Sequence, residues 1–367
     1  MILIQTKGDE KMEIVNVDLK DYSYPIYISN GILKDIGVYL KKHLRSNRVL
    51  IITDSNVSEL YLTRLENSLL NNGFMVHHSI IKAGEESKNL DTVKHLLEEC
   101  FKFGLLRDSA IIALGGGVVG DIAGLVSALF MRGIDFIQVP TTLLAQVDSS
   151  VGGKVGVNLK EGKNMAGAFY QPKAVFVDTD VLKSLDKREI RGGICEIIKY
   201  GIIKDASLFN FIESNIKEIL DLDDEKVRHL IKRSCEIKSD VVSKDEKESS
   251  IRAVLNYGHT IGHAIESLTK YKKYIHGEAV AIGMYYAAKI ALNRKYIDID
   301  YLYRIRSLLV ASELPVDYVN LDKYEIVEGI KHDKKNREGR IKFVLPVGQG
   351  DADIFDVSEE EILRVLN

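Results

Sequence analysis

The sequence predicts an α/β N-terminal domain with a Rossmann-like parallel sheet, followed by an α-helical C-terminal domain. Three observations support this fold class. Short β-branched runs alternate with helical patterns in the first half, and β signals become rare from about Val181. The length of 367 residues also favours two domains, because single cores stop growing near roughly 250–300 residues. We therefore expect an α/β domain over 1–180 and a mainly helical domain over 181–367.

Five runs in the first half have the β-branched composition of strands, and two runs between them have helical patterns that end in glycine. Strands separated by helices of this length indicate a parallel sheet with helices on both faces. The expected strands are 48–54, 74–81, 109–115, 135–142 and 174–178, and the expected helices are 58–73 and 90–104.

The second half contains long segments with the apolar spacing of amphipathic helices. A late run, "GRIKFVLPVGQGDADIF", instead suggests a pair of strands near the end of the chain. The expected helices are 208–222, 225–245, 276–294 and 302–313.

Composition limits the classes of partner. The net charge of −3 provides no basic field for nucleic acid, and three cysteines without close pairing fit a reduced, cytoplasmic protein. The most apolar stretch, 109–131, contains five glycines and Asp121, which fits a strand, a glycine turn and a buried helix better than a membrane span. We therefore expect no nucleic-acid partner and no association with a membrane.

The run "GGGVVG" (115–120) follows an expected strand and precedes an expected helix. Glycines in that context let the backbone approach a pyrophosphate at the helix N-terminus. The motif is also compatible with a tight crossover that needs glycine only for packing. Acids at the ends of two earlier strands, Asp54 in "TDSN" and Glu85 in "GEESK", are candidates for binding ribose hydroxyls, or are solvated loop residues.

The segment 140–172 combines glycine-containing turns, hydroxyl side chains and the lysines Lys154 and Lys163, and Arg132 precedes it. It is too apolar to be a simply exposed loop, so lysines within it are expected to need anionic partners. An acidic small molecule is the natural candidate.

Histidines and acids in the second half have the pattern of a metal site. His259 and His263 lie four residues apart on one helical face, although the glutamate of an H-E-x-x-H motif is missing between them. A carboxylate and two imidazoles would suit Zn²⁺ and leave a position open for substrate. From the residues alone the ligands are any three of Glu196, His259, His263, His276 and Glu278; the alternative is ordinary helix histidines.

Seven segments together resemble the 3-dehydroquinate synthase family, over about residues 48–348. The resemblance implies NAD, Zn²⁺ or Co²⁺, and a homodimer. It also suggests that the first dozen residues are an extension, with Met12 as a possible alternative start. The segments are "GGGVVGDIAG", "MRGIDFIQVPTTLLAQVDSSVGGKVGVN", "GKNMAGAFYQP", "EIIKYG", "DEKESSIRAVLNYGHTIGHAIE", "HGEAVAIGM" and "DKKNREGRIKFVLP".

The resemblance assigns roles to individual positions. The metal ligands match Glu196, His259 and His276, whereas the residue matching His263 lies against the substrate and handles protons. The positions around the substrate match Arg132, Asp148, Lys154, Lys163, Asn164, Lys199, Lys238, Arg252, Asn256 and Lys334, with Lys335 as the alternative to the last. The positions around NAD match Asp54, Glu85, Lys88, Gly116, Gly117, Val118, Val119, Gly120, Asp121, Thr141, Thr142, Lys154, Lys163, Val181, Leu182, Lys183 and Ser184. The sequence departs from the family pattern at two positions, Cys195 and Ala83, and neither difference removes a functional group.

The implied reaction converts 3-deoxy-D-arabino-heptulosonate 7-phosphate to 3-dehydroquinate and phosphate, in the shikimate pathway. It proceeds by transient oxidation with NAD, phosphate elimination, re-reduction and an intramolecular aldol closure. Such an acidic sugar phosphate explains basic side chains gathered within a slightly acidic protein. The competing interpretations are a metal-dependent dehydrogenase of the glycerol dehydrogenase type, another sugar phosphate cyclase, and a non-enzymatic NAD-binding module.

Overall fold

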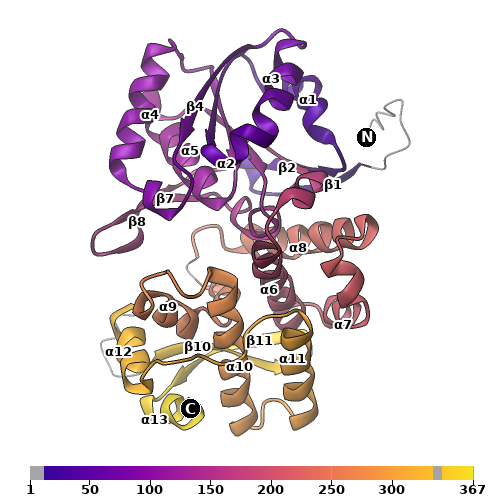
Figure 1. The fold of residues 1–367 in the computed structure, drawn as a ribbon, viewed down its shortest axis with the longest axis vertical. Helices are drawn as coiled ribbons and strands as arrows, with labels where there is room; N and C mark the ends of the chain where they lie inside the picture. The colour runs from indigo at the N-terminus through magenta and orange to yellow at the C-terminus, as the bar shows by residue number, and fades with distance from the viewer. Residues whose placement is uncertain (1–11, 249, 334–340, 367) are drawn as a thin grey trace. The chain divides into compact units, whose positions relative to one another are not determined.

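The chain forms two compact units that divide between Ser184 and Leu185 (Figure 1). The computed structural model describes residues 12–248, 250–333 and 341–366. Residues Thr179–Ser184 form a 3-10 turn, η7, that belongs to the first unit, where the Tyr61 hydroxyl donates to the Val181 carbonyl oxygen at 3.1 Å.

The first unit contains a seven-stranded sheet in the order β1-β2-β9-β6-β5-β3-β4. All five strands expected from the sequence are present and are parallel to their neighbours, with ends that differ by at most two residues. Two further strands, β1 and β2, form an antiparallel pair at one edge and were not expected. The strands are β1 (Glu13–Val17), β2 (Tyr24–Ser29), β3 (Arg48–Asp54), β4 (Met75–Ile81), β5 (Ala110–Gly115), β6 (Asp135–Pro140) and β9 (Ala174–Asp178).

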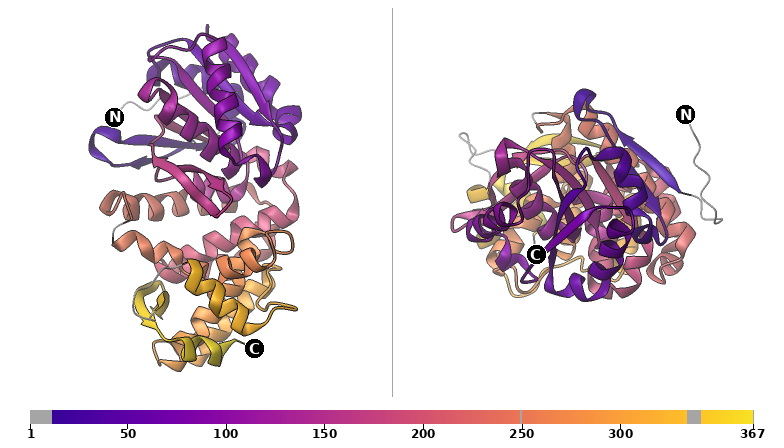
Figure 2. Two further views of the ribbon diagram at one scale, coloured as in Figure 1. Left: turned by 90° about the vertical axis from the view of Figure 1, so that its left-hand side faces the viewer. Right: turned by 90° about the horizontal axis from the view of Figure 1, so that it is seen from above.

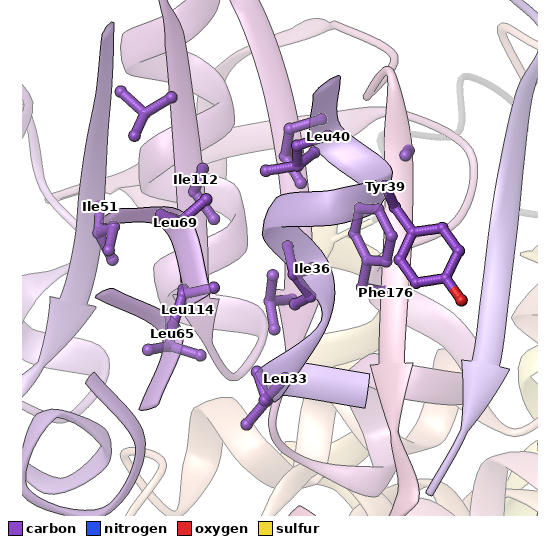
Figure 3. Packing of buried hydrophobic residues seen from close by; sticks show 14 of the residues in the cluster. Leu33, Ile36, Tyr39, Leu40, Ile51, Leu65, Leu69, Ile112, Leu114 and Phe176 are labelled. Carbon is purple, nitrogen blue, oxygen red and sulfur yellow. The ribbon is translucent and has the colours of Figure 1, made fainter. Parts of the chain in front are cut away.

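Helices cover both faces of this sheet, because its strands are apolar on both sides. Alternate residues of β3 enter different cores: Ile51 packs in one cluster with α1 and α3, and Leu50 packs in the other with α4 and α5. Figure 3 shows the first cluster, in which Ile36 and Leu40 of α1 lie over the sheet. The helices are α1 (Ile36–His43), α2 (Ser55–Val57), α3 (Thr63–Leu70), α4 (Leu90–Lys102) and α5 (Gly117–Leu129), and a π-helical turn, η3 (Ser58–Leu62), joins α2 to α3.

The segment 140–172 differs from the buried loop that the sequence suggested. It contains a π-helical turn, η6 (Ala145–Ser149), and an antiparallel hairpin of β7 (Lys154–Leu159) and β8 (Gly162–Phe169). Val155 and Val157 are buried against α5, whereas Lys154 is exposed. Lys154 is therefore not buried with the apolar residues of its segment, because side chains alternate between the two faces of a strand.

The second unit is mainly helical, as the sequence predicted, and the expected strand pair near the end is also present. Figure 2 shows the same ribbon from two further directions. The helices are α6 (Lys187–Ile203), α7 (Ala206–Leu220), α8 (Asp224–Lys244), α9 (His259–Leu268), α10 (His276–Asn293), α11 (Ile299–Ala311), α12 (Lys323–Asp333) and α13 (Glu359–Val365); η8 (Ile251–Asn256) is a 3-10 segment, and the strands are β10 (Ile341–Gly348) and β11 (Asp351–Val357). Within the described residues, none of the helices has the length and apolar character needed to span a membrane.

Candidate metal centre and nucleotide-binding edge

The residues expected to contact a nucleotide follow the carboxyl ends of five parallel strands. Asp54 ends β3, Glu85 follows β4, Gly116 follows β5, Thr141 follows β6, and η7 follows β9. Since these strands are adjacent and parallel, all five positions lie at one edge of the sheet. Ligands of open α/β sheets bind at this edge.

The glycine turn lies at the point where the strand order reverses. The chain adds β4 on one side of β3, and then β5, β6 and β9 on the other side. The crevice beside β5 is therefore the topological switch point, where such sheets bind dinucleotides. This order explains why the glycine motif comes after earlier strands rather than after the first.

Close packing at the glycine turn leaves little room for side chains. A Cβ atom on Gly116 would lie 3.0 Å from Thr142 Cγ2, and one on Gly117 would lie 3.1 Å from Ser149 Oγ. A Cβ atom on Gly120 would lie 2.9 Å from Gln138 Oε1 of β6, so this glycine lets α5 approach the sheet. Gly116 is the N-cap of α5 and makes no side-chain cap, and the first backbone N–H groups of a helix are groups that can bind a phosphate.

Several expected ligand residues form a polar network beside this turn. Lys88, whose side chain is 8% exposed, lies 2.6 Å from the Asp121 carboxylate and donates to Asn164 Oδ1 at 2.5 Å. Glu85 accepts from Asn158 Nδ2 at 2.7 Å, and its carboxylate lies 4.0 Å from Lys163 Nζ. The network therefore brings Lys163 and Asn164 of the β7–β8 hairpin next to the loop that carries Glu85 and Lys88.

The other expected residues of the first unit have local roles. Asp54 caps α2 by accepting from the N–H groups of Asn56 and Val57. Thr142 Oγ1 accepts from the Ala145 N–H at 3.2 Å, and Lys183 Nζ lies 2.6 Å from Asp180 Oδ1.

The remaining expected site residues of the first unit range from exposed to buried. Arg132 is exposed and has a positive φ of 69°, Asp148 is half-buried in η6, and Val181 and Leu182 are buried. None of these observations tests a contact with a ligand, so the assignments stay predictions.

Glu196, His259 and His276 come together in the second unit. Glu196 Oε1 lies 3.8 Å from His259 Nε2 and 3.7 Å from His276 Nε2, and one ligand atom of each of the three residues lies within 4.8 Å of the others. Ligand atoms of a tetrahedral zinc ion, each about 2.0–2.2 Å from the metal, are roughly 3.3–3.6 Å apart. The three side chains therefore nearly have the spacing of a metal site.

The electrostatics of this cluster also suit a cation. The Glu196 carboxylate is fully buried, and its oxygens meet no hydrogen-bond donor with good geometry in the described residues, although Lys199 forms an ion pair with it. A buried carboxylate needs compensating positive charge. The Lys199 ammonium supplies part of this charge, and a divalent ion facing both imidazoles would supply more.

The two imidazoles differ in their tendency to bind protons. Burial and the nearby charge of Lys199 hold the pKa of His259 well below its usual value, which keeps the ring neutral as a metal ligand must be. Burial also acts to lower the pKa of His276, but the hydrogen bond and charge of Glu266, together with Glu196, raise it overall. Protons therefore compete with a metal at His276 as the pH falls.

Two of the five candidate ligands do not belong to the cluster around Glu196. His263 lies one turn beyond His259, with the two rings edge to face and their centroids 5.3 Å apart. Glu278 instead binds Arg188 through two contacts of 2.6 Å and accepts from the Ile275 N–H at the start of α10. His263 therefore lies outside the group that Glu196, His259 and His276 form.

Buried cations accompany the cluster on neighbouring elements. Lys199 of α6, Lys238 of α8 and Arg252 of η8 are at most 6% exposed, and these three elements pack against one another. Arg252 Nη1 donates to the Glu246 carbonyl oxygen at 2.5 Å, and Asn256 Nδ2 donates to Glu248 Oε1 at 2.8 Å.

Two acids of this region were missed by the sequence reasoning, and one expected lysine cannot be placed. Glu248 is the partner of Asn256, and Glu266 contacts His276. The position of Glu266 seven residues after His259, on the same helical face, was the available signal. Lys334, like its alternative Lys335, lies outside the described residues.

The fold, the glycine turn and the histidine–glutamate cluster are typical of nucleotide-dependent metalloenzymes. Residues 78–192 match the N-terminal family of 3-dehydroquinate synthase, and residues 193–336 match its C-terminal family. The chain belongs to the 3-dehydroquinate synthase family.

Full-length relatives and solved structures agree with this family. A 3-dehydroquinate synthase of Thermoanaerobacter pseudethanolicus is 61% identical over 97% of this chain and 100% of its own length. A 2-deoxy-scyllo-inosose synthase, solved with carbaglucose-6-phosphate, NAD⁺ and Co²⁺, matches with a TM-score of 0.88 and 30% identity over 96% of this chain and 99% of its own. ValA, a 2-epi-5-epi-valiolone synthase from Streptomyces hygroscopicus subsp. jinggangensis with NAD⁺ and Zn²⁺ bound, matches with a TM-score of 0.87 and 28% identity over 95% and 97%.

Proposed function

We propose that this chain converts 3-deoxy-D-arabino-heptulosonate 7-phosphate to 3-dehydroquinate and phosphate. The observation that carries the proposal is the buried set of Glu196, His259 and His276 with three buried cations on elements that pack together. It stands in a chain 61% identical to a 3-dehydroquinate synthase, so the dehydrogenase alternative is not favoured.

Two groups that this chain would hold supply part of the chemistry. A Zn²⁺ or Co²⁺ ion held by Glu196, His259 and His276 would act as a Lewis acid toward substrate oxygens. NAD, held by the backbone of the glycine turn and by side chains at the strand edge, would accept and return a hydride. The solved sugar phosphate cyclases with NAD⁺ and Co²⁺ or Zn²⁺ support both assignments.

The remaining steps depend on side chains of the chain itself. Lys199, Lys238 and Arg252 are suited to bind the carboxylate and phosphate of the substrate, because charge-assisted hydrogen bonds from Lys and Arg to anionic oxygens are strong and these side chains are shielded from water. The hydrogen bond to the Glu246 carbonyl oxygen holds the Arg252 guanidinium in place. A fixed guanidinium would orient the departing phosphate. His263, beside the metal ligands, would exchange protons with substrate hydroxyls.

Phosphate release without net NADH is the expected result of the direct assay. The full chain is supplied with the heptulosonate phosphate, Zn²⁺ and NAD at a small fraction of the substrate concentration. Phosphate release should exceed the NAD present many-fold, absorbance at the NADH wavelength should stay flat, and a chelator should stop the reaction. The reason is that NAD is regenerated in every turnover.

Two control substrates separate the competing functions. Glucose 6-phosphate, which carbaglucose-6-phosphate copies, lacks the carboxylate and should release little phosphate. Glycerol should produce no NADH. Accumulating NADH would favour a dehydrogenase, and faster reaction with glucose 6-phosphate would favour another sugar phosphate cyclase.

The homodimer and the cytoplasmic location are also part of the proposal. The homodimer rests on the family alone, and light scattering of the purified chain should give twice the chain mass. The cytoplasm is supported by Cys100, Cys195 and Cys235, which are buried free thiols.

A further inference from the structure

In both imidazoles of the metal cluster, one ring nitrogen faces Glu196 and the other faces an oxygen atom of a different residue. His259 Nδ1 lies 3.0 Å from the Tyr257 carbonyl oxygen, and His276 Nδ1 lies 3.3 Å from Glu266 Oε2. Their Nε2 atoms are the ones that face Glu196. Because the closer oxygen atom lies at Nδ1 in both rings, the arrangement favours the tautomer with the proton on Nδ1 and the lone pair on Nε2.

We propose that Glu266 is a positioning residue that orients His276 and sets the affinity of the metal site. This inference rests on the metal centre of the proposed function. An outer carboxylate that accepts from a ligand histidine fixes the ring and increases its basicity toward the ion. The corresponding partner of His259 is the backbone carbonyl of Tyr257, which no side-chain substitution removes. The partner of His276 is the Glu266 side chain, which a mutation can change.

The placement of Glu266 supports a specific role. It lies two helical turns after His259 on α9, and α9 packs along α10, whose first residue is His276. Glu266 is 4% exposed. A carboxylate at this depth is costly unless charged or hydrogen-bonding partners compensate it, and the His276 N–H is one such partner.

A second ion bound by His263, Glu266 and His276 is the alternative that the distances allow, because their ligand atoms also lie within 4.8 Å of one another. His276 is common to both groups, and its Nε2 is the atom that faces Glu196. A neutral imidazole has one lone pair, so it binds one ion and donates from its other nitrogen. The hydrogen bond to Glu266 therefore fits the ring better than a second ion.

The test is a Co²⁺ titration of the metal-free full chain, with affinity measured against a competing chelator and coordination followed by visible absorption. The variants are Glu266→Gln, which keeps an acceptor without charge, and Glu266→Ala, which removes both. We expect the affinity for Co²⁺ to fall about 10-fold in Glu266→Gln and up to about 100-fold in Glu266→Ala. The visible spectrum of bound Co²⁺ should change in both variants. The wild-type chain should bind one Co²⁺.

Glu278→Gln is the matched control, because Glu278 is another largely buried carboxylate at the start of α10 but binds Arg188 rather than the His276 ring. This variant should lower the thermal midpoint of the metal-free chain and leave the Co²⁺ spectrum unchanged. If both Glu266 variants lower only the thermal midpoint, Glu266 is structural and the inference is wrong.

Two stoichiometries would also overturn the inference. Two Co²⁺ per wild-type chain, with one lost in Glu266→Ala, would establish the second ion instead, and a wild-type chain that binds no Co²⁺ would remove the centre itself. A chain that shows the expected order of affinities but releases no phosphate would support the inference and contradict the proposed function.

Discussion

Replacing His259 by alanine should remove the bound metal and nearly all phosphate release. The substitution leaves Glu196 facing one imidazole and Lys199, which is too few ligands for a tight divalent site. Metal affinity should therefore fall by more than the roughly 10–100-fold that loss of an outer partner costs. If the metal stabilises the transition state by about 4 kcal/mol as a Lewis acid, its loss in His259→Ala lowers the rate about 10³-fold. Zinc per chain after dialysis and initial phosphate release measure the two effects.

His263→Ala is the control one helical turn further along α9. Its ring lies beside that of His259 but outside the cluster around Glu196, so this variant should keep a full equivalent of zinc. Its rate should fall about 10²–10⁴-fold, the usual contribution of a positioned proton-transfer group. Equal loss of zinc in the two variants would contradict the ligand assignment.

This contrast also shows that the sequence pattern alone could not identify the metal ligands. The i, i+4 spacing of His259 and His263 suggested a shared ion, and five residues remained as possible ligands. The choice depends on tertiary packing: α6 brings Glu196 to His259 and His276, whereas Arg188 pairs with Glu278. Only the family resemblance pointed to the set that the structure brings together.

The sheet was predictable to the extent that its strands are locally distinct. The five parallel strands are continuous apolar runs, as expected for strands covered on both faces. The β7–β8 hairpin was missed because Gly156 and Gly167, which pair directly, read as loop residues. A Cβ atom on Gly156 would lie 2.8 Å from the Ala166 carbonyl oxygen, so these glycines allow two strands to approach closely. That requirement is invisible until the partner strand is known.

The contact between α9 and α10 is also built on glycine, and a methyl group there should disrupt the metal centre from a distance. A Cβ atom on Gly283 of α10 would clash with the Gly258 carbonyl oxygen and lie 3.0 Å from the Gly262 nitrogen. That carbonyl accepts the Gly262 N–H at 3.0 Å in the first turn of α9. Gly258 itself has a φ of 80°, which favours glycine and starts the helix immediately before His259.

Gly283→Ala is therefore expected to push the first turn of α9 away from α10. Alanine gains about 1 kcal/mol in helix propensity over glycine, but overpacking against a backbone costs typically about 1–3 kcal/mol and sometimes more. Because the clash is with a backbone oxygen, we expect a cost near the upper end of this range and a net loss of about 2 kcal/mol in the unfolding free energy, measured by urea unfolding with circular dichroism. Zinc affinity should fall at least about 10-fold, as for loss of an outer partner, because the first turn carries His259.

Gly348→Ala is the matched control at the end of β10, where a Cβ atom would meet no heavy atom within 4 Å among the described residues. Its unfolding free energy should stay within about 0.5 kcal/mol of the wild-type value, with unchanged zinc content. If Gly283→Ala had wild-type stability but lost zinc, the methyl group would act only on the position of His259. If it were destabilised but kept its zinc affinity, the spacing of His259 and His276 would not depend on this helix contact. The packing of α6, which carries Glu196, would then have to determine the geometry of the metal centre.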